Sequence, residues 1–77
     1  MYTTNRYYYR YGKEGDYVDM TTKKFNSLEK AINYAERYAT GIRFVSVEIL
    51  DENDNVVYEI LQDGRVFSNG CRLVPTP

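Results

Sequence analysis

Residues 27–39, SLEKAINYAERYA, form the one stretch of this chain with the clear periodicity of an amphipathic helix. The apolar residues recur at helical spacing and make one stripe, and the charged residues lie outside it. The stripe consists of Leu28, Ala31, Ile32, Ala35, Tyr38 and Ala39. Asn26 or Ser27 can cap the first turn, and Asn26 has the spacing of a capping box with Glu29. Gly41 is expected to end the helix.

The segments around this helix have the composition of β-strands bounded by polar or glycine-containing turns. The predicted strands are 2–11, 17–25, 42–50, 56–61 and 65–68. Because one helix can cover only one face of a sheet, the order ββαβββ predicts an α+β fold with the helix on one face of a mostly antiparallel sheet. A right-handed crossover then gives the strand order 2-1-3-4-5. Residues 1–70 are expected to form one domain and 71–77 a flexible tail.

Alternation along each strand divides the side chains between the two faces of the sheet. The face under the helix is predicted to take Tyr7, Tyr9, Tyr11, Val18, Met20, Val45, Val47, Ile49, Val56, Tyr58 and Ile60. The open face is predicted to take Arg6, Tyr8, Arg10, Tyr17, Asp19, Phe44, Ser46, Glu48, Val57 and Glu59. Ile32 and Ala35 of the helix are predicted to be buried against the sheet. A register shift of one residue would exchange the two sets within a strand.

The composition excludes several classes of function. Histidine is absent and Cys71 is the single cysteine, which removes the His-containing metal motifs and the Ser-His and Cys-His nucleophile arrangements. We therefore expect no enzyme, no metal and no cofactor. The net charge of −1 argues against broad attraction to nucleic acid or to membranes. A lone cysteine cannot form an internal disulfide, and this favours a cytoplasmic protein.

The run RYYYRY at residues 6–11 interleaves aromatic rings with guanidinium groups. Single-stranded nucleic acid is bound by such surfaces, since the rings stack on bases and the charges meet phosphates. The residues nominated for this role are Arg6, Tyr8, Arg10 and Tyr17. Two other interpretations stay open. The tyrosines can fill a small core while the arginines pair with Asp19 or Glu48, or the run can form a protein-binding surface, where Tyr and Arg are enriched.

Residues 44–64 contain acidic residues and no Lys or Arg. The residues nominated as an acidic contact surface are Glu48, Asp51, Glu52, Asp54 and Glu59. An acidic hairpin can occupy a basic nucleic-acid channel on another protein, because its carboxylates take the place of phosphates. The simpler interpretation is that Asp and Asn suit a surface turn and that Glu solvates the open side of a strand.

The block FNSLEKAINYAERYATGIRFVSVEILDENDNVVYEILQDGRVF, residues 25–67, combines a helix start of the F-x-S-x-x-x-A type with following strands and a D-G turn. In this layout the chain resembles small phage-encoded anti-CRISPR proteins, and it also resembles several uncharacterised bacterial domains. The resemblance covers about half of the chain and carries over no binding residue. It implies a phage or mobile-element inhibitor that occupies a surface of a host defence complex.

Three hypotheses about function follow from these observations. The first is a small non-enzymatic protein that acts by protein–protein contact, as an inhibitor that blocks a nucleic-acid site of a bacterial CRISPR-type complex. The second is a single-stranded nucleic-acid-binding domain that uses the aromatic-basic residues. The third is a structural module whose edge strand pairs with a copy of itself to give a homodimer.

Overall fold

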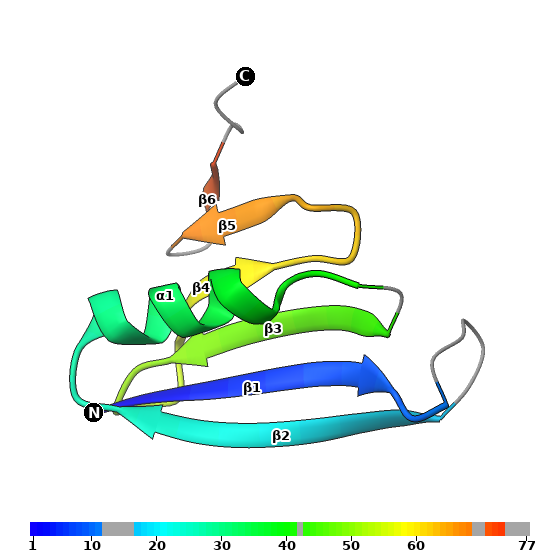
Figure 1. The fold of residues 1–77 in the computed structure, drawn as a ribbon. Coiled ribbons are helices and arrows are strands. Elements are labelled where there is room, and N and C mark those ends of the chain that lie inside the picture. The colour runs from blue at the N-terminus through cyan, green and yellow to red at the C-terminus, as the bar shows by residue number, and fades with distance from the viewer. Residues whose placement is uncertain (12–16, 42, 69–70, 74–77) are drawn as a thin grey trace.

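The computed structural model describes residues 1–11, 17–41, 43–68 and the backbone of 71–73. It has one helix and one six-stranded sheet (Figure 1), so the predicted α+β class and the order ββαβββ are confirmed, with one more strand added at the end. The elements are β1 (Tyr2–Tyr9), β2 (Val18–Phe25), α1 (Leu28–Tyr38), β3 (Phe44–Leu50), β4 (Val56–Ile60), β5 (Val66–Ser68) and β6 (Cys71–Leu73).

The strands lie in the order β2-β1-β3-β4-β5-β6, and each neighbouring pair is antiparallel. The predicted order 2-1-3-4-5 is therefore correct, and β2 and β6 lie at the two ends of the sheet. Residues 71–73, which were expected to belong to a tail, form β6 against β5. The two prolines at positions 75 and 77 come after this strand, so they do not interrupt its pairing. Residues 12–16, between the first two predicted strands, and the rest of the predicted tail lie outside the described residues.

The helix begins one residue later and ends one residue earlier than predicted. Ser27 is the N-cap, and its hydroxyl oxygen accepts a hydrogen bond from the backbone N–H of Lys30 at 3.2 Å. Asn26 lies one residue before the cap, so the predicted capping box with Glu29 does not form around it. After the helix, Gly41 has a φ of +96°, a left-handed conformation that glycine adopts without steric cost.

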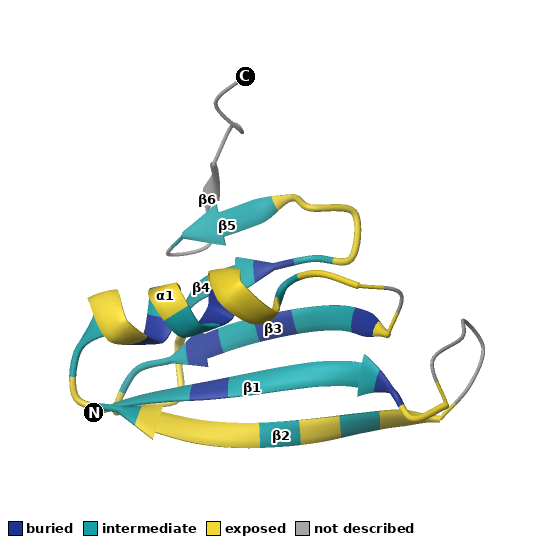
Figure 2. Cartoon of the chain, in the orientation of Figure 1, coloured by how far each residue is buried: buried dark blue, intermediate teal, exposed yellow. Residues whose placement is uncertain are grey.

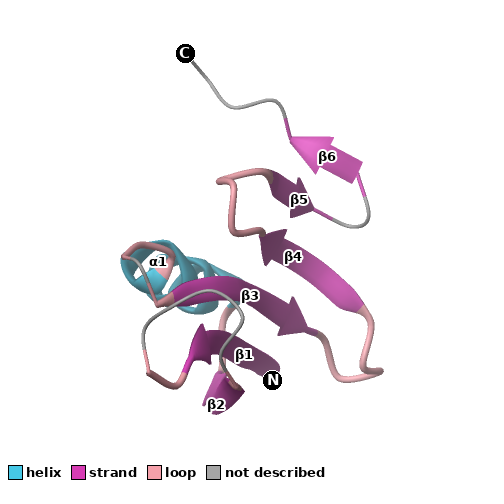
Figure 3. Cartoon of the chain, turned by 90° about the vertical axis from the view of Figure 1, so that its right-hand side faces the viewer, coloured by secondary structure: helices cyan, strands magenta, loops and turns pink. Residues whose placement is uncertain are grey.

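Helix α1 covers one face of the sheet and contacts β1, β2, β3 and β4, and in Figure 3 β5 and β6 extend beyond it. Ala31 and Ala35 are fully buried at this contact (Figure 2), and their small side chains let the helix lie close to the strands. The core consists of Ala31, Ala35, Phe44, Val47, Ile49 and Ile60. Ala35 is thus buried as predicted, whereas Ile32 is only partly buried at the edge of this core.

The predicted division of side chains between the faces is wrong for β1 and β2. Directly opposite residues of an antiparallel pair share a face. Arg6 lies opposite Val47 and Thr4 opposite Ile49, and these partners belong to the core beneath the helix. Arg6, Tyr8 and Asp19 therefore lie on the helix-covered face, while Tyr7, Tyr9, Val18 and Met20 lie on the opposite face. Both alternating sets of β1 contain tyrosines and polar residues, so alternation did not reveal which set is buried.

Two register shifts change the predicted faces in β3 and β4. The shift between Tyr7 and Tyr8 brings Phe44 opposite Tyr8, and Phe44 is buried in the core instead of lying on the open face. A second shift lies between Ile49 and Leu50. Beyond it Val56, predicted to be covered, is exposed, and Val57, predicted to be open, packs against the core. Val47, Ile49 and Ile60 belong to the core as predicted, and Tyr58 packs against it.

Candidate functional site

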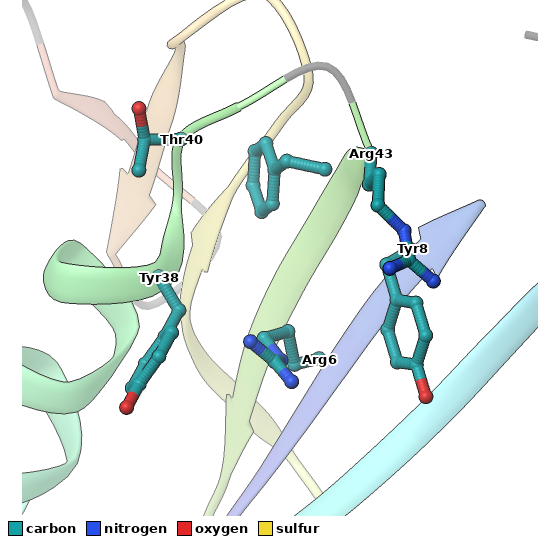
Figure 4. A pocket seen from close by; sticks show the side chains of 6 residues that line it. Arg6, Tyr8, Tyr38, Thr40 and Arg43 are labelled. Atoms are coloured by element: carbon teal, nitrogen blue, oxygen red, sulfur yellow. The ribbon is translucent and has the colours of Figure 1, made fainter. Parts of the chain in front are cut away.

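A pocket of about 350 Å³ opens where the end of α1 meets the start of β3 and the middle of β1. We call it the Arg–Tyr pocket, and its lining residues are Arg6, Tyr8, Tyr38, Thr40, Arg43 and Phe44 (Figure 4). Residues distant in the sequence meet here because the register shift in β1 brings the start of β3 beside Tyr8. The turn at Gly41 lets the chain reverse direction between the helix and β3.

Arg6 occupies the centre of this pocket, between the rings of Tyr38 and Tyr8 (Figure 4). The guanidinium carbon lies 4.8 Å from the ring centroid of Tyr38 and 5.3 Å from that of Tyr8. These distances are in the range of cation–π contacts. The Nε atom of Arg6 is buried and has no hydrogen-bond partner within the described residues. Ring contacts therefore hold this arginine, and its Nε lies shielded from solvent.

Arg43 is held on the other side of Tyr8. Its Nε donates to the carbonyl oxygen of Tyr9 at 3.1 Å, and its Nη2 donates to the carbonyl oxygen of Arg10 at 2.7 Å. The guanidinium carbon lies 5.6 Å from the centroid of the Tyr8 ring. Two backbone bonds fix the guanidinium group at the end of β1, so its orientation is set before any ligand arrives.

Arg10 forms a two-bond ion pair with Asp19 of β2. Its Nε lies 3.0 Å from Oδ2 and its Nη2 lies 2.8 Å from Oδ1, as the hypothesis of internal pairing expected. The hydrogen bond from Arg10 is the main cause that lowers the pKa of Asp19, and the charges of Arg10 and Arg43 act in the same direction. The exposed ring of Tyr17 lies 5.6 Å from the Arg10 guanidinium carbon.

Of the nominated aromatic-basic residues, Arg6 and Tyr8 line the pocket on the helix side of the sheet, not on the open face, and Arg10 and Tyr17 contact each other outside its lining. Sequence reasoning missed Tyr38, Thr40 and Arg43. Tyr38 was counted as part of the apolar stripe, yet it lies at the exposed end of the helix and its ring contacts Arg6. Antiparallel pairing of the first and third strands would have brought Arg43 near the end of β1, which is the one signal available in the sequence.

The nominated acidic residues divide into two groups. Glu48 and Glu59 lie directly opposite each other in β3 and β4, on the sheet face away from the helix. Tyr7 lies on this face too. Burial raises the pKa of Tyr7 most strongly, followed by the negative charge of Glu48, a hydrogen bond with Glu48 and the charge of Glu59. This face is therefore acidic, whereas the pocket on the other side of the sheet is basic.

The second acidic group belongs to the turn between β3 and β4. The Asp51 carboxylate accepts hydrogen bonds from the backbone N–H groups of Asn55 and Asn53, at 3.0 and 2.8 Å, and these bonds lower its pKa. Glu52 accepts a hydrogen bond from the Met1 amino group at 2.7 Å, and Asp54 has a φ of +63°. The Asp51 carboxylate is thus used within the turn, as the simpler interpretation of this segment expected.

Within the described part of the chain, no cluster of three or more His, Cys, Asp or Glu side chains is arranged to bind a metal ion. The helix described above is too short and too polar to cross a membrane. Comparisons of the chain with protein-family models, with curated proteins and with solved structures gave no match. Arguments about function therefore depend on the geometry of the pocket and of the acidic face.

Proposed function

We propose that the protein is a non-enzymatic binding domain for single-stranded nucleic acid, which it contacts through the Arg–Tyr pocket and the rings next to it. One observation carries the proposal: Arg6 and Arg43 pack against tyrosine rings and not against carboxylates. The ion pairs among the described residues are Met1–Glu52, Arg10–Asp19 and Arg65–Asp63. Neither guanidinium group takes part in these ion pairs, so each keeps a positive charge that can attract an anion, although two donors of Arg43 already bind backbone carbonyls.

Exposed tyrosine rings supply the second requirement of a single-strand binder. Tyr38, which lines the pocket, is 40% exposed, and Tyr17, which lies outside the lining against Arg10, is 71% exposed, so both present ring surface to solvent. Bases stack on such rings with little dependence on sequence, while arginines meet the phosphates. The net charge of −1 is compatible with this proposal because the acidic residues Glu48 and Glu59 lie on the opposite face of the sheet.

Fluorescence anisotropy with labelled single-stranded oligonucleotides at low salt tests the proposal. We expect binding that weakens with salt at a slope of about −0.7 for each phosphate neutralised. The Arg6→Ala and Arg43→Ala variants should each weaken binding. Arg65→Ala is the matched control, because Arg65 is exposed and pairs with Asp63 at 2.6 Å in another turn. Equal affinity in all three variants would refute the proposal.

A second candidate function is the inhibitor of a CRISPR-type defence complex that the sequence suggested. The position of Glu48 and Glu59 favours it: within the sheet Glu48 has Asn5 and Glu59 as cross-strand neighbours, and Glu59 has Glu48 and Phe67. Among the described residues, neither carboxylate has a cation directly opposite it in the sheet, so both can attract a basic surface of a partner protein, although Glu48 also hydrogen-bonds Tyr7.

A pull-down from a host lysate, with and without nuclease treatment, tests this second candidate. A nuclease-resistant protein partner that the Glu48→Lys, Glu59→Lys double variant no longer captures would support it, and capture that is lost on nuclease treatment would contradict it. A cytoplasmic location is part of both proposals, since the single cysteine favours a reducing compartment.

A further inference from the structure

Strand β2 forms one end of the sheet, and its outer edge faces no other strand within the described part of the chain (Figure 1). Directly before β2, the backbone N–H of Arg10 donates to the carbonyl oxygen of Tyr17 at 2.8 Å. Backbone hydrogen bonds alternate in direction along an antiparallel strand, so the odd-numbered residues of β2 turn their backbone groups toward β1. The even-numbered residues turn theirs toward the free edge. These residues are Val18, Met20, Thr22 and Lys24, and all four are exposed.

Two apolar side chains lie exposed at this edge. Val18 is opposite Tyr9 and Met20 is opposite Tyr7, on the sheet face away from the helix. Val18 is 51% exposed and Met20 is 54% exposed. A strand paired with β2 would cover part of this apolar surface and would bond the outward backbone groups. The edge therefore has both the hydrogen-bonding groups and the apolar surface that an added strand needs.

The charges of β2 select a second copy of the same strand. Asp19 and Lys23 lie at equal distances before and after Thr21, on one face of the sheet. Two copies of β2 that pair antiparallel about a two-fold axis at Thr21 place Asp19 of each copy opposite Lys23 of the other. Opposite charges at directly opposed positions of a sheet attract each other. The strand is therefore complementary to itself in charge.

Only this register aligns the two charges. An axis at Met20 would place Asp19 opposite Thr21, and an axis at Thr22 would place Lys23 opposite Thr21. With the axis at Thr21, the odd-numbered residues form the non-hydrogen-bonded pairs of the new interface, in which opposed side chains lie closest. The Met20 side chains of the two copies are then diagonal neighbours, within reach of a long side chain.

The contacts that Asp19 and Lys23 already make leave room for this pairing. Asp19 binds Arg10, but each oxygen of a carboxylate can accept more than one hydrogen bond. Lys23 is exposed, and its Nζ lies 5.3 Å from the ring centroid of Tyr34. An ammonium group has three donors, so a ring contact does not use up its capacity.

We propose that a second copy of this chain binds along the free edge of β2, so that the two sheets join antiparallel about Thr21 into one continuous sheet. The residues of this edge lie outside the lining of the Arg–Tyr pocket. The inference therefore goes beyond the proposed function and does not depend on it. Because pairing of single strands buries a small area, the dimer should dissociate on dilution.

Sedimentation velocity of the full chain between about 10 µM and 1 mM tests for this dimer. Asp19→Lys and Lys23→Asp should each raise the dissociation constant about tenfold or more, because two attractive pairs per dimer become repulsive. An equimolar mixture of the two variants should regain the dimer, since opposite charges then face each other again. Lys30→Asp is the matched control, because Lys30 is exposed on α1 and not on β2. Circular dichroism of each variant excludes unfolding.

A disulfide test identifies the register independently of the charges. With the axis at Thr21, this residue meets its own equivalent at a Cα separation of about 4.5 Å, which a disulfide can span. In a Cys71→Ser background, Thr21→Cys should therefore oxidise readily to a covalent dimer. Lys24→Cys is the control, because Lys24 would lie opposite Val18 of the other copy and far from its own equivalent.

The results have opposite meanings for the inference. A concentration-dependent dimer that is restored by mixing the two charge variants and is cross-linked through Thr21→Cys would support it. A chain that stays monomeric at about 1 mM would overturn it and would leave the β2 edge to a strand of another protein. A dimer that neither charge variant weakens, or that cross-links equally through Lys24→Cys, would also overturn it.

Discussion

The two faces of the sheet differ in charge and in what holds their polar groups. On the helix side, Arg6 and Arg43 lie against tyrosine rings at the end of α1. On the other side, Glu48 and Glu59 face each other next to Tyr7. Side chains alternate along a strand, so Arg6 and Tyr7, adjacent in β1, lie on opposite faces. A net charge near zero can thus hide two surfaces of opposite sign.

The largest expected effect is on stability, from truncating a core side chain beneath the helix. Ile49 is fully buried, so Ile49→Ala should lower the free energy of unfolding by about 2 to 5 kcal/mol, from lost burial and the cavity that remains. Met20 is 54% exposed on the other face, and Met20→Ala should cost about 0.5 kcal/mol or less. Urea denaturation of both variants measures the difference. Equal costs would mean that the two faces are not packed as described.

Next in size is the effect of charge on binding of single strands. Arg6→Ala or Arg43→Ala should weaken binding by about tenfold, because a charged hydrogen bond is lost. The Glu48→Gln, Glu59→Gln double variant should change affinity by about twofold or less, since charges are screened over about 8 Å at physiological salt. Anisotropy titrations compare the variants. A larger effect from the glutamates would move the binding surface to the acidic face.

A smaller effect is expected at Thr4 beneath the helix. Its side chain is fully buried, and its hydroxyl has no hydrogen-bond partner among the described residues. Thr4→Val should raise the free energy of unfolding by about 1 kcal/mol, because an unsatisfied polar group is replaced by a methyl group of similar size. Thr22→Val on the open face is the control, since the Thr22 hydroxyl donates to Asn5 Oδ1 at 2.8 Å. A gain in Thr22→Val but not in Thr4→Val would contradict this account.

The smallest effect is a dependence of stability on alkaline pH. The pKa values of Tyr7 and Tyr58 are raised in the folded chain, mainly by burial in both cases, from the ordinary value of about 10. The unfolded chain therefore ionises these phenols first, so their contribution is fully present below about pH 10 and is lost as the pH rises toward the folded pKa values.

Chemical denaturation between about pH 9 and 11 measures this loss. Tyr7→Phe should make it shallower, and Glu48→Gln should do so in part, because the Glu48 charge and hydrogen bond help to raise the pKa of Tyr7. Glu36→Gln should act on the Tyr58 contribution instead. A pH profile unchanged by Tyr7→Phe would show that its phenol is not protected in the folded chain.

The elements and their order could be predicted from the sequence because the signals are local. The helix stripe, the terminal Gly41 and the alternation of Val47 and Ile49 each follow from neighbouring residues. The faces of β1 could not be predicted, since both of its alternating sets contain tyrosines. The strand registers shift by one residue beside Tyr8 and beside Leu50, and such shifts depend on packing across strands.

The residues of the pocket, too, could be predicted from the sequence only in part. Arg6 and Tyr8 could be nominated from their own segment, but Arg43 joins them through hydrogen bonds to carbonyl groups of β1, far away in the sequence. Tyr38 was not nominated because its position in the apolar stripe indicated a core residue. A binding surface assembled from a strand, a helix end and a second strand is therefore only partly visible before the fold is known.

Strand β2 lies at one end of the sheet, and among the described residues only its β1 side has a hydrogen-bonded neighbour. Free strand edges are where fibrils recruit further copies of a chain. Lys23 and Lys24 lie on this strand, exposed and on opposite faces. Stacking of copies in parallel register would place each lysine beside its own equivalent and repel the incoming chain. The positive charges on β2 therefore act against fibril growth, and losing them would make concentrated solutions of the protein prone to aggregate.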